Sequence, residues 1–170
     1  NDPSESFTVN ELIVGYWEHC QRHYVKNGKP TDEQHCIKSA LRFVRQLYGN
    51  TQAAEFNPLA LKASRQKMID AGWVRTSINT HVGRIRRMFK WGAEHELVPT
   101  QIWVNLQTVN GLQRGRSEAC EAEPVKPVPE QFVAAVEEYV SRQVWAMIQL
   151  QRLSGMRPGE VVIVRGCDID

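Results

Sequence analysis

The feature that most constrains the fold is a helix-start signal followed by apolar residues at helical spacing, a combination that recurs along the first 110 residues. Its first occurrence begins at residues 8–11 (Thr-Val-Asn-Glu), which have the form of a capping box. Leu12, Tyr16 and Cys20 then recur every four residues, which predicts a helix to about Val25. Because such a helix has only one apolar face, several helices must pack together to bury those faces, and a helical bundle is expected.

Three further start signals follow the first one. Residues 31–34 (Thr-Asp-Glu-Gln) form a second box, Asn57-Pro58 supplies a cap with a proline at the first helical position, and Thr76 is expected to cap a fourth helix. The second helix is expected to end at Gly49, and the third at about residues 71–72. After Pro99 a short amphipathic segment covers residues 100–106. The apolar positions expected to be buried in the second and fourth helices are Ile37, Ala40, Leu41, Val44, Leu47, Tyr48, Ile78, Val82, Ile85, Phe89 and Gly92. No convincing strand precedes Glu160, so we predict an all-α domain of four helices and a short fifth over residues 1–110.

The composition changes between residues 110 and 129. Glycines and prolines interrupt a charged run there, which predicts an interdomain linker over residues 111–129. A new helix is expected from about Glu130, and another over residues 144–153, where apolar residues again recur at helical spacing. Residues 130–170 are therefore expected to be the opening part of a second domain.

The turn after that helix carries a distinctive motif, Ser154-Gly155-Met156-Arg157-Pro158-Gly159-Glu160. Gly155 is expected to end the helix in the left-handed conformation, and Pro158 to begin another helix. Arg157 precedes a proline, which favours an extended backbone at this position. Its guanidinium would then lie beside the free N–H groups of the following helix, an arrangement suited to binding phosphate.

These residues resemble the first arginine motif of tyrosine recombinases, the phage-integrase family. The resemblance covers residues 155–160, the apolar run 161–165 and residues 168–170, but Ser154 replaces the usual Thr and Gly166 replaces a frequent Trp. Residues 76–91 are similar to the last long helix of the family's core-binding domain, and residues 8–107 resemble that domain diffusely. The resemblance implies a SAM-like core-binding bundle of four to five helices, followed by the first helices of an incomplete mixed α/β catalytic domain.

The resemblance also implies an activity. In this family a tyrosine attacks the scissile phosphate without a metal or cofactor and forms a 3′-phosphotyrosyl link. Arg157 would bind that phosphate, and Glu160 would orient Arg157 or cap the helix. The family's hairpin lysine, its second arginine with a histidine and its nucleophilic tyrosine come later than Asp170, so the 170 residues alone are expected to bind DNA weakly and to catalyse nothing. The expected setting is a phage or mobile element in a bacterial cytoplasm, at the nucleoid, with self-association of the full-length protein on double-stranded DNA.

The distribution of charge agrees with a DNA-binding bundle, although the overall charge of +2 is uninformative. Eight basic and three acidic residues occupy positions 57–96, whereas six Glu and one Lys occupy positions 118–139. Basic residues lie opposite the apolar stripes of the second and fourth helices, as expected of helices that follow a phosphate backbone, and Gly83 would allow the backbone to approach it closely. The candidate DNA-binding residues are Lys38, Arg42, Arg45, Lys62, Arg65, Thr76, Asn79, Thr80, Arg84, Arg87 and Lys90.

Two other functions remain open at this stage. A non-enzymatic regulator could bind DNA through the bundle and dimerise through its C-terminal helices, and a helical protein-interaction domain could carry the same basic residues on a solvated face. Zinc binding by His19, Cys20, His23 and the pair His35-Cys36 is not expected, because no standard ligand spacing is present. The four scattered cysteines do not predict disulfides. The polar N-terminus, residues 1–5, and the absence of a long apolar run do not predict a signal peptide or a membrane span.

Overall fold

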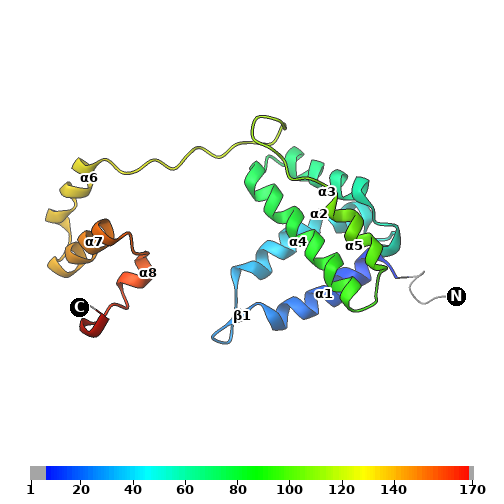
Figure 1. The fold of residues 1–170 in the computed structure, drawn as a ribbon, viewed down its shortest axis with the longest axis horizontal. Helices are drawn as coiled ribbons and strands as arrows, with labels where there is room; N and C mark the ends of the chain where they lie inside the picture. Colours follow the sequence, from blue (N-terminus) through cyan, green and yellow to red (C-terminus); the bar gives the residue numbers. More distant parts are fainter. Residues whose placement is uncertain (1–6, 169–170) are drawn as a thin grey trace. The chain divides into compact units, whose positions relative to one another are not determined.

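A computed structural model describes residues 7–168 of the chain (Figure 1). The predicted polar N-terminus at residues 1–5, and Ile169 and Asp170 at the end of the recombinase-like motif, lie outside the described residues. The chain divides into two compact units, residues 1–123 and residues 124–170, which are described separately. Most of the described chain is helical, as predicted, and the sheet that it contains has two short strands.

The first unit is a helical bundle built around one central helix (Figure 1). Its α-helices are α1 (Val9–His23), α2 (Asp32–Tyr48), α3 (Pro58–Asp70), α4 (Arg75–Glu94) and α5 (Thr100–Gln107), with a 3₁₀ turn, η2 (Ala53–Glu55), before α3. Helix α4 packs against α1, α2, α3 and α5. The prediction of four helices followed by a short fifth is therefore confirmed for the described part of this unit.

Two of the four predicted helix starts have the expected caps. The Thr8 hydroxyl accepts a hydrogen bond from the Glu11 N–H at 3.3 Å, and the Glu11 carboxylate accepts one from the Thr8 N–H at 2.7 Å, so the capping box forms. The Asn57 side chain accepts bonds from the N–H groups of Leu59 and Ala60 at the start of α3. These caps satisfy backbone donors that have no partner within the helix.

The other two predicted caps are wrong. Thr31 precedes α2, but its hydroxyl donates to the Tyr24 carbonyl at 3.1 Å and caps nothing. Helix α4 begins at Arg75, after Val74, so Thr76 lies inside the helix. Val74 forms an isolated bridge with Cys120, and this pairing with a distant segment fixes where α4 starts.

A short β-hairpin joins α1 to α2, which contradicts the expectation of no strand in the bundle. Strand β1 (Val25–Lys26) pairs antiparallel with β2 (Lys29–Pro30). Asn27 and Gly28 connect the strands with φ values of 52° and 75°, the conformation that favours Asn-Gly in two-residue hairpin turns. Helix α1 therefore ends at His23, two residues before the predicted end.

The core of the bundle is formed mainly by the predicted apolar positions. Ile78, Val82, Ile85 and Phe89 of α4 are buried as expected, and the Phe89 ring stacks on Phe56 at 4.5 Å between centroids. In α2 the prediction was partly wrong, because Leu47 is exposed and Phe43 is buried. The Phe43 ring packs edge-to-face on Trp73, with centroids 5.2 Å apart. Since α1, α3 and α4 all pack against α2, the buried face of α2 is wider than one helical stripe.

The segment after α5 is bound to the bundle over much of its length. The Asn79 side chain accepts a hydrogen bond from the Leu112 N–H at 2.8 Å and donates one to the Leu112 carbonyl at 3.0 Å. Further along, Arg75 forms an ion pair with Glu121 at 2.6 Å, and Ala119 is buried. The compact unit consequently extends to Glu123, whereas the linker was predicted to begin at residue 111.

The second unit contains short helices and few buried side chains. Its elements are α6 (Glu130–Ala135), η3 (Glu137–Tyr139), α7 (Arg142–Ser154), α8 (Pro158–Val161) and η4 (Gly166–Asp168). Among its described residues Val161 alone is buried. Its large exposed apolar side chains are Val125, Val128, Phe132, Val136, Tyr139, Val144, Leu153, Met156, Val162 and Ile163. This unit therefore presents an extensive apolar surface. Across the described part of the whole chain, no helix combines the length and the apolar character that crossing a bilayer requires.

Candidate nucleic-acid interface

One face of α4 is open to solvent along most of the helix. Thr76, Thr80, Gly83, Arg87 and Lys90 follow one another at intervals of three or four residues, so they lie on the same side of the helix. The four side chains are exposed, and a Cβ atom at Gly83 would meet no other atom within 4 Å. The α4 face, as we name these five residues, therefore combines two cations, two hydroxyl groups and a stretch of accessible backbone.

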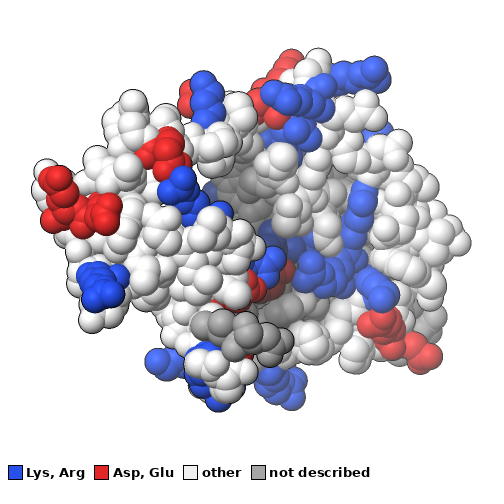
Figure 2. Space-filling model, turned by 60° about the vertical axis from the view of Figure 1, so that its left-hand side comes forward, with Lys and Arg blue, Asp and Glu red and all other residues white. Residues whose placement is uncertain are grey.

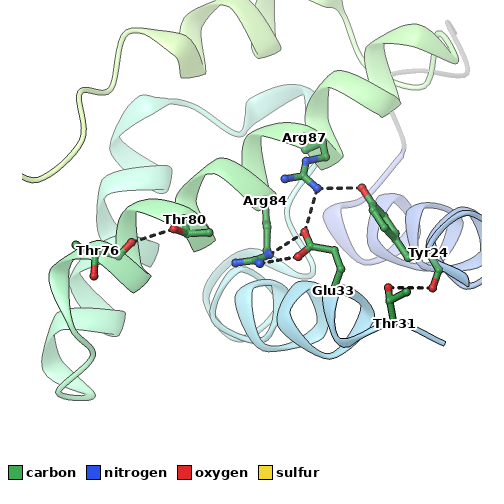
Figure 3. Close-up of polar contacts among 7 residues, drawn as sticks. All are labelled: Tyr24, Thr31, Glu33, Thr76, Thr80, Arg84 and Arg87. Carbon is green, nitrogen blue, oxygen red and sulfur yellow. Dashed lines mark hydrogen bonds and ion pairs between the residues drawn. The ribbon is translucent and has the colours of Figure 1, made fainter. Parts of the chain in front are cut away.

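Glu33 of α2 braces the cations of α4 from one side (Figure 3). Its carboxylate accepts two hydrogen bonds from Arg84, at 3.0 and 2.6 Å, and one from Arg87 at 3.0 Å. The same Arg87 nitrogen lies 2.9 Å from the Tyr24 hydroxyl, to which it donates. Arg87 is thus held in place while its side chain stays 46% exposed, so a phosphate could still reach it.

Arg84 does not belong to this open face, which corrects its prediction as a DNA-binding residue. It is only 9% exposed and reaches across to α2, where the bidentate bond to Glu33 compensates its burial (Figure 3). The hydrogen bond with Arg84 is also the main reason why the pKa of Glu33 lies below its ordinary value. The same hydrogen bond raises the pKa of Arg84, so both groups are charged at neutral pH.

The polar residues near the start of α4 have partners within the protein. The Asn79 amide oxygen and nitrogen both form hydrogen bonds with the Leu112 backbone. Asn79 therefore binds another part of the bundle, whereas contacts with bases or phosphates were expected. The Thr80 hydroxyl donates to the Thr76 carbonyl at 3.0 Å (Figure 3), which leaves its oxygen able to accept a further bond. Lys90 forms an exposed ion pair with Glu94 at 3.3 Å.

The predicted cations of α2 form a second exposed strip. The Lys38 ammonium lies 5.2 Å from the centre of the Trp17 ring, and the Arg42 guanidinium lies 4.8 Å from that of Phe43. Together with Arg45 they line a groove of about 830 Å³ between α1 and α2, whose apolar wall includes Ile13. The side-chain stems therefore rest on aromatic and apolar surface while the charged ends are exposed.

Lys62 and Arg65 form a third cationic site, on α3 beside the segment that follows α5. Arg65 donates to the Asn110 carbonyl at 2.9 Å. The structure thus distributes the predicted cations over α2, α3 and α4. In Figure 2 the Lys and Arg side chains lie in several groups on the visible face, with acidic side chains beside some of them.

The turn around Arg157 in the second unit has the predicted backbone conformation. Gly155 ends α7 with φ 69°, Arg157 is extended at φ −70° and ψ 150°, and Pro158 is the first residue of α8. The Arg157 N–H donates to the Glu160 carboxylate at 2.8 Å, which is the capping role expected for Glu160. The guanidinium lies 3.8 Å from the same side chain, and the Arg157 side chain is 87% exposed.

One expectation for this turn is wrong. Helix α8 has four residues, a single turn, so it does not provide the helix N-terminal anion site that the sequence suggested. The exposed guanidinium of Arg157 is therefore the group through which we expect this turn to bind phosphate.

The residues weighed as zinc ligands do not form a cluster. His19 and His23 stack at 5.1 Å between ring centroids, and Cys20 is buried in the core. Within residues 7–168, no group of three or more potential ligands is placed to hold a metal ion.

Sequence reasoning missed Glu33 and Tyr24, the residues that brace α4. Glu33 appeared only as part of a capping pattern, and no local signal connects either residue to Arg87, which lies 54 positions after Glu33. No protein-family model, curated protein or solved structure matches this chain. A function for it therefore has to be inferred from its own residues.

Proposed function

We propose that this chain is part of a tyrosine-type site-specific DNA recombinase, an integrase of a phage or mobile element. In this proposal residues 1–123 are a SAM-like core-binding bundle that binds double-stranded DNA. Residues from 130 onward are the first helices of a mixed α/β catalytic domain. The observation that carries the proposal is the position of Arg157. Its guanidinium is exposed, and its backbone lies in a turn that three residues restrict. The turn lies within a motif that resembles the family's first arginine motif.

The geometry of the turn supports a phosphate-binding role for Arg157. The left-handed Gly155, the proline at position 158 and the Glu160 carboxylate each restrict the backbone on which Arg157 stands. A guanidinium has several donors in a fixed plane and binds two phosphate oxygens at once. Placed by this fixed backbone, the guanidinium would stabilise the charge that develops on a phosphoryl group in transfer.

The bundle supports DNA binding through its exposed helix faces. The α4 face offers Arg87 and Lys90 together with open backbone at Gly83, and α2 offers its own cationic strip. Glu33 and Tyr24 limit the movement of Arg87, so less conformational entropy is lost when a phosphate binds there. Contacts of this kind provide affinity without sequence readout.

The reaction would follow the family's chemistry. A tyrosine attacks the scissile phosphate, the 5′-hydroxyl leaves and a 3′-phosphotyrosyl link forms, after which the 5′-hydroxyl of another strand attacks that link and releases the tyrosine. Arg157 would bind the phosphate in both steps, and no metal or cofactor takes part. The proposal requires the parent protein to supply a lysine hairpin, a second arginine with a histidine and the tyrosine after Asp170.

The test is covalent capture of DNA by the parent protein. A duplex with a nick near the cleavage site would trap the phosphotyrosyl intermediate, which is detected as a protein–DNA adduct on a denaturing gel. We expect Arg157→Ala to lower the capture rate by roughly 100-fold or more, the effect of losing one donor to a developing anion. Arg157→Lys should restore part of the rate. Arg142→Ala, which removes another exposed arginine of the same unit, is the control and should retain it.

Three results would contradict the proposal. If Arg157→Ala captured DNA at the wild-type rate, Arg157 would not be an active-site residue. If the 170-residue chain captured DNA by itself, the reaction would use residues other than the family's later lysine, arginine, histidine and tyrosine. If the parent protein binds DNA but forms no adduct, a DNA-binding regulator is the better account. The exposed apolar surface of residues 124–168 favours that second candidate, because it could serve for dimerisation.

A further inference from the structure

A polar hollow in the bundle is lined by three cations. It lies between α3 and the segment that follows α5, and its volume is about 360 Å³. Lys62 and Arg65 come from α3, and Arg116 comes from the later segment. The remaining lining is Thr108, Asn110, Gly111, Leu112 and Gln113. No carboxylate is among these residues, so the lining itself carries three cationic side chains and no anionic one.

A fourth cation, Arg86 of α4, lies next to the hollow. Arg86 donates to the Val109 carbonyl and Arg65 donates to the next carbonyl, that of Asn110, so two guanidinium groups bind consecutive residues of one segment. The Nε atom of Arg86 is buried and has no hydrogen-bond partner. Neither arginine forms an ion pair within residues 7–168.

The proximity of these cations has an energetic consequence. Burial lowers the pKa of Arg86, and the charge of Arg65 lowers it further, while burial lowers the pKa of Arg65. Two like charges in a partly buried site destabilise each other, and carbonyl dipoles compensate them only in part. An anion that enters the hollow would relieve this repulsion and would pair with Lys62 and Arg116 at the same time.

We propose that this hollow is a phosphoryl-binding site, built from Lys62, Arg65 and Arg116 with Arg86 behind them. The tetrahedral phosphoryl group has several acceptor oxygens, so it can accept from guanidinium and ammonium donors that come from α3 and from the segment after α5. Two sources share this chemistry: a backbone phosphate of bound DNA and a free phosphate or pyrophosphate. The first source rests on the proposed DNA-binding function, whereas the second does not.

The site can be tested with inorganic pyrophosphate and the whole 170-residue chain. Its readout is the Nε–Hε resonances of Arg65 and Arg86 in nitrogen–proton correlation spectra, recorded at constant ionic strength with chloride as the balancing anion. The test variant is Lys62→Ala/Arg116→Ala, because both side chains are exposed and neither one binds the Val109 or Asn110 carbonyl. Its control is Arg22→Ala/Lys67→Ala, which removes two exposed cations elsewhere on the bundle.

We expect the two resonances of the wild-type chain to shift saturably with pyrophosphate. The test variant should bind it at least roughly tenfold more weakly, as expected for the loss of charge-assisted contacts, while the control stays within about twofold of the wild type. The absence of a saturable shift would overturn the proposal. Equal affinities of the test variant and the wild type would also overturn it.

A salt titration of duplex DNA binding then distinguishes the two sources. If the phosphate belongs to DNA, the test variant should lower the slope of log K against log salt by about 0.9 per lost phosphate contact, relative to the control. If the test variant and the control bind DNA equally but differ with pyrophosphate, the ligand is a free phosphate. A wild-type chain that binds pyrophosphate and no DNA would contradict the proposed function and leave this site supported.

Discussion

Glu33→Gln is expected to destabilise the bundle strongly, because it removes the carboxylate that compensates the charge of Arg84. The Arg84 side chain is 11% exposed and that of Glu33 is 25% exposed. Removing one partner costs about 3–5 kcal/mol in a buried ion pair, whereas an exposed pair contributes about 0–1 kcal/mol. Since Glu33 is partly solvated, we expect the free energy of unfolding to fall by roughly 2–3 kcal/mol.

Urea unfolding followed by far-ultraviolet circular dichroism measures this loss. Thermal unfolding followed by the same signal gives Tm. At about 4 °C per kcal/mol for a domain of this size, Tm should fall by roughly 10 °C. Glu18→Gln, on the exposed side of α1, is the matched control and should change the stability by less than about 0.5 kcal/mol. The double variant Glu33→Gln/Arg84→Met should lose less than the sum of its single variants, because no unpaired charge remains. A stability of Glu33→Gln equal to that of Glu18→Gln would refute the reasoning.

The same ion pair predicts a dependence on pH. The pKa of Glu33 is lowered in the folded protein, chiefly by its hydrogen bond with Arg84, whereas the unfolded chain has the ordinary value near 4.5. The pair therefore stabilises the fold above pH 4.5, and this contribution is lost as the pH falls through the lower folded value. The difference in unfolding free energy between wild type and Glu33→Gln should shrink over that range. A constant difference would contradict the assignment.

Three substitutions test other parts of the account. Gly83→Ala should raise the free energy of unfolding by roughly 0.5–1 kcal/mol, because Ala is favoured in a helix and the added Cβ meets no atom, yet it should weaken DNA binding measured by fluorescence anisotropy. An unchanged DNA affinity would show that the Gly83 backbone does not approach the DNA closely. Gly92→Ala should cost roughly 1–3 kcal/mol in urea unfolding, since its Cβ would lie 2.7 Å from a Leu12 methyl group, and a neutral effect would mean that Leu12 moves aside easily. Asn79→Ala should accelerate amide hydrogen exchange at Leu112, and wild-type protection there would contradict its role in holding that segment.

The helices could be predicted where local signals decide them. The Thr8 and Asn57 caps involve atoms within three residues, and the conformations of Gly155, Arg157 and Pro158 follow from glycine and proline geometry. These effects depend on neighbours in the sequence, so the amino-acid order is sufficient to find them.

The candidate site was predicted less well, because its details depend on contacts between distant residues. Arg84 appeared to lie on the polar face of a helix, but α2 covers that side and supplies Glu33 from 51 residues away. Asn79 likewise binds Leu112, which is 33 residues later. A helical wheel assumes one buried face, and α4 has neighbours on several sides. The start of α4 was misplaced for a similar reason, since Val74 pairs with Cys120.

The central claim is that the bundle binds duplex DNA through the α4 face, and the most direct test is the salt dependence of that binding. The comparison is between the wild-type chain, Arg87→Ala/Lys90→Ala and the control Arg22→Ala/Lys67→Ala, measured by fluorescence anisotropy with a duplex probe. We expect log K to fall linearly with log salt, and the α4 variant should reduce the magnitude of the slope by about 1.8, which is about 0.9 for each of two lost phosphate contacts. The control should keep a slope close to that of the wild type. A nearly flat salt response of the wild-type chain, or equal slopes for the two variants, would contradict the claim.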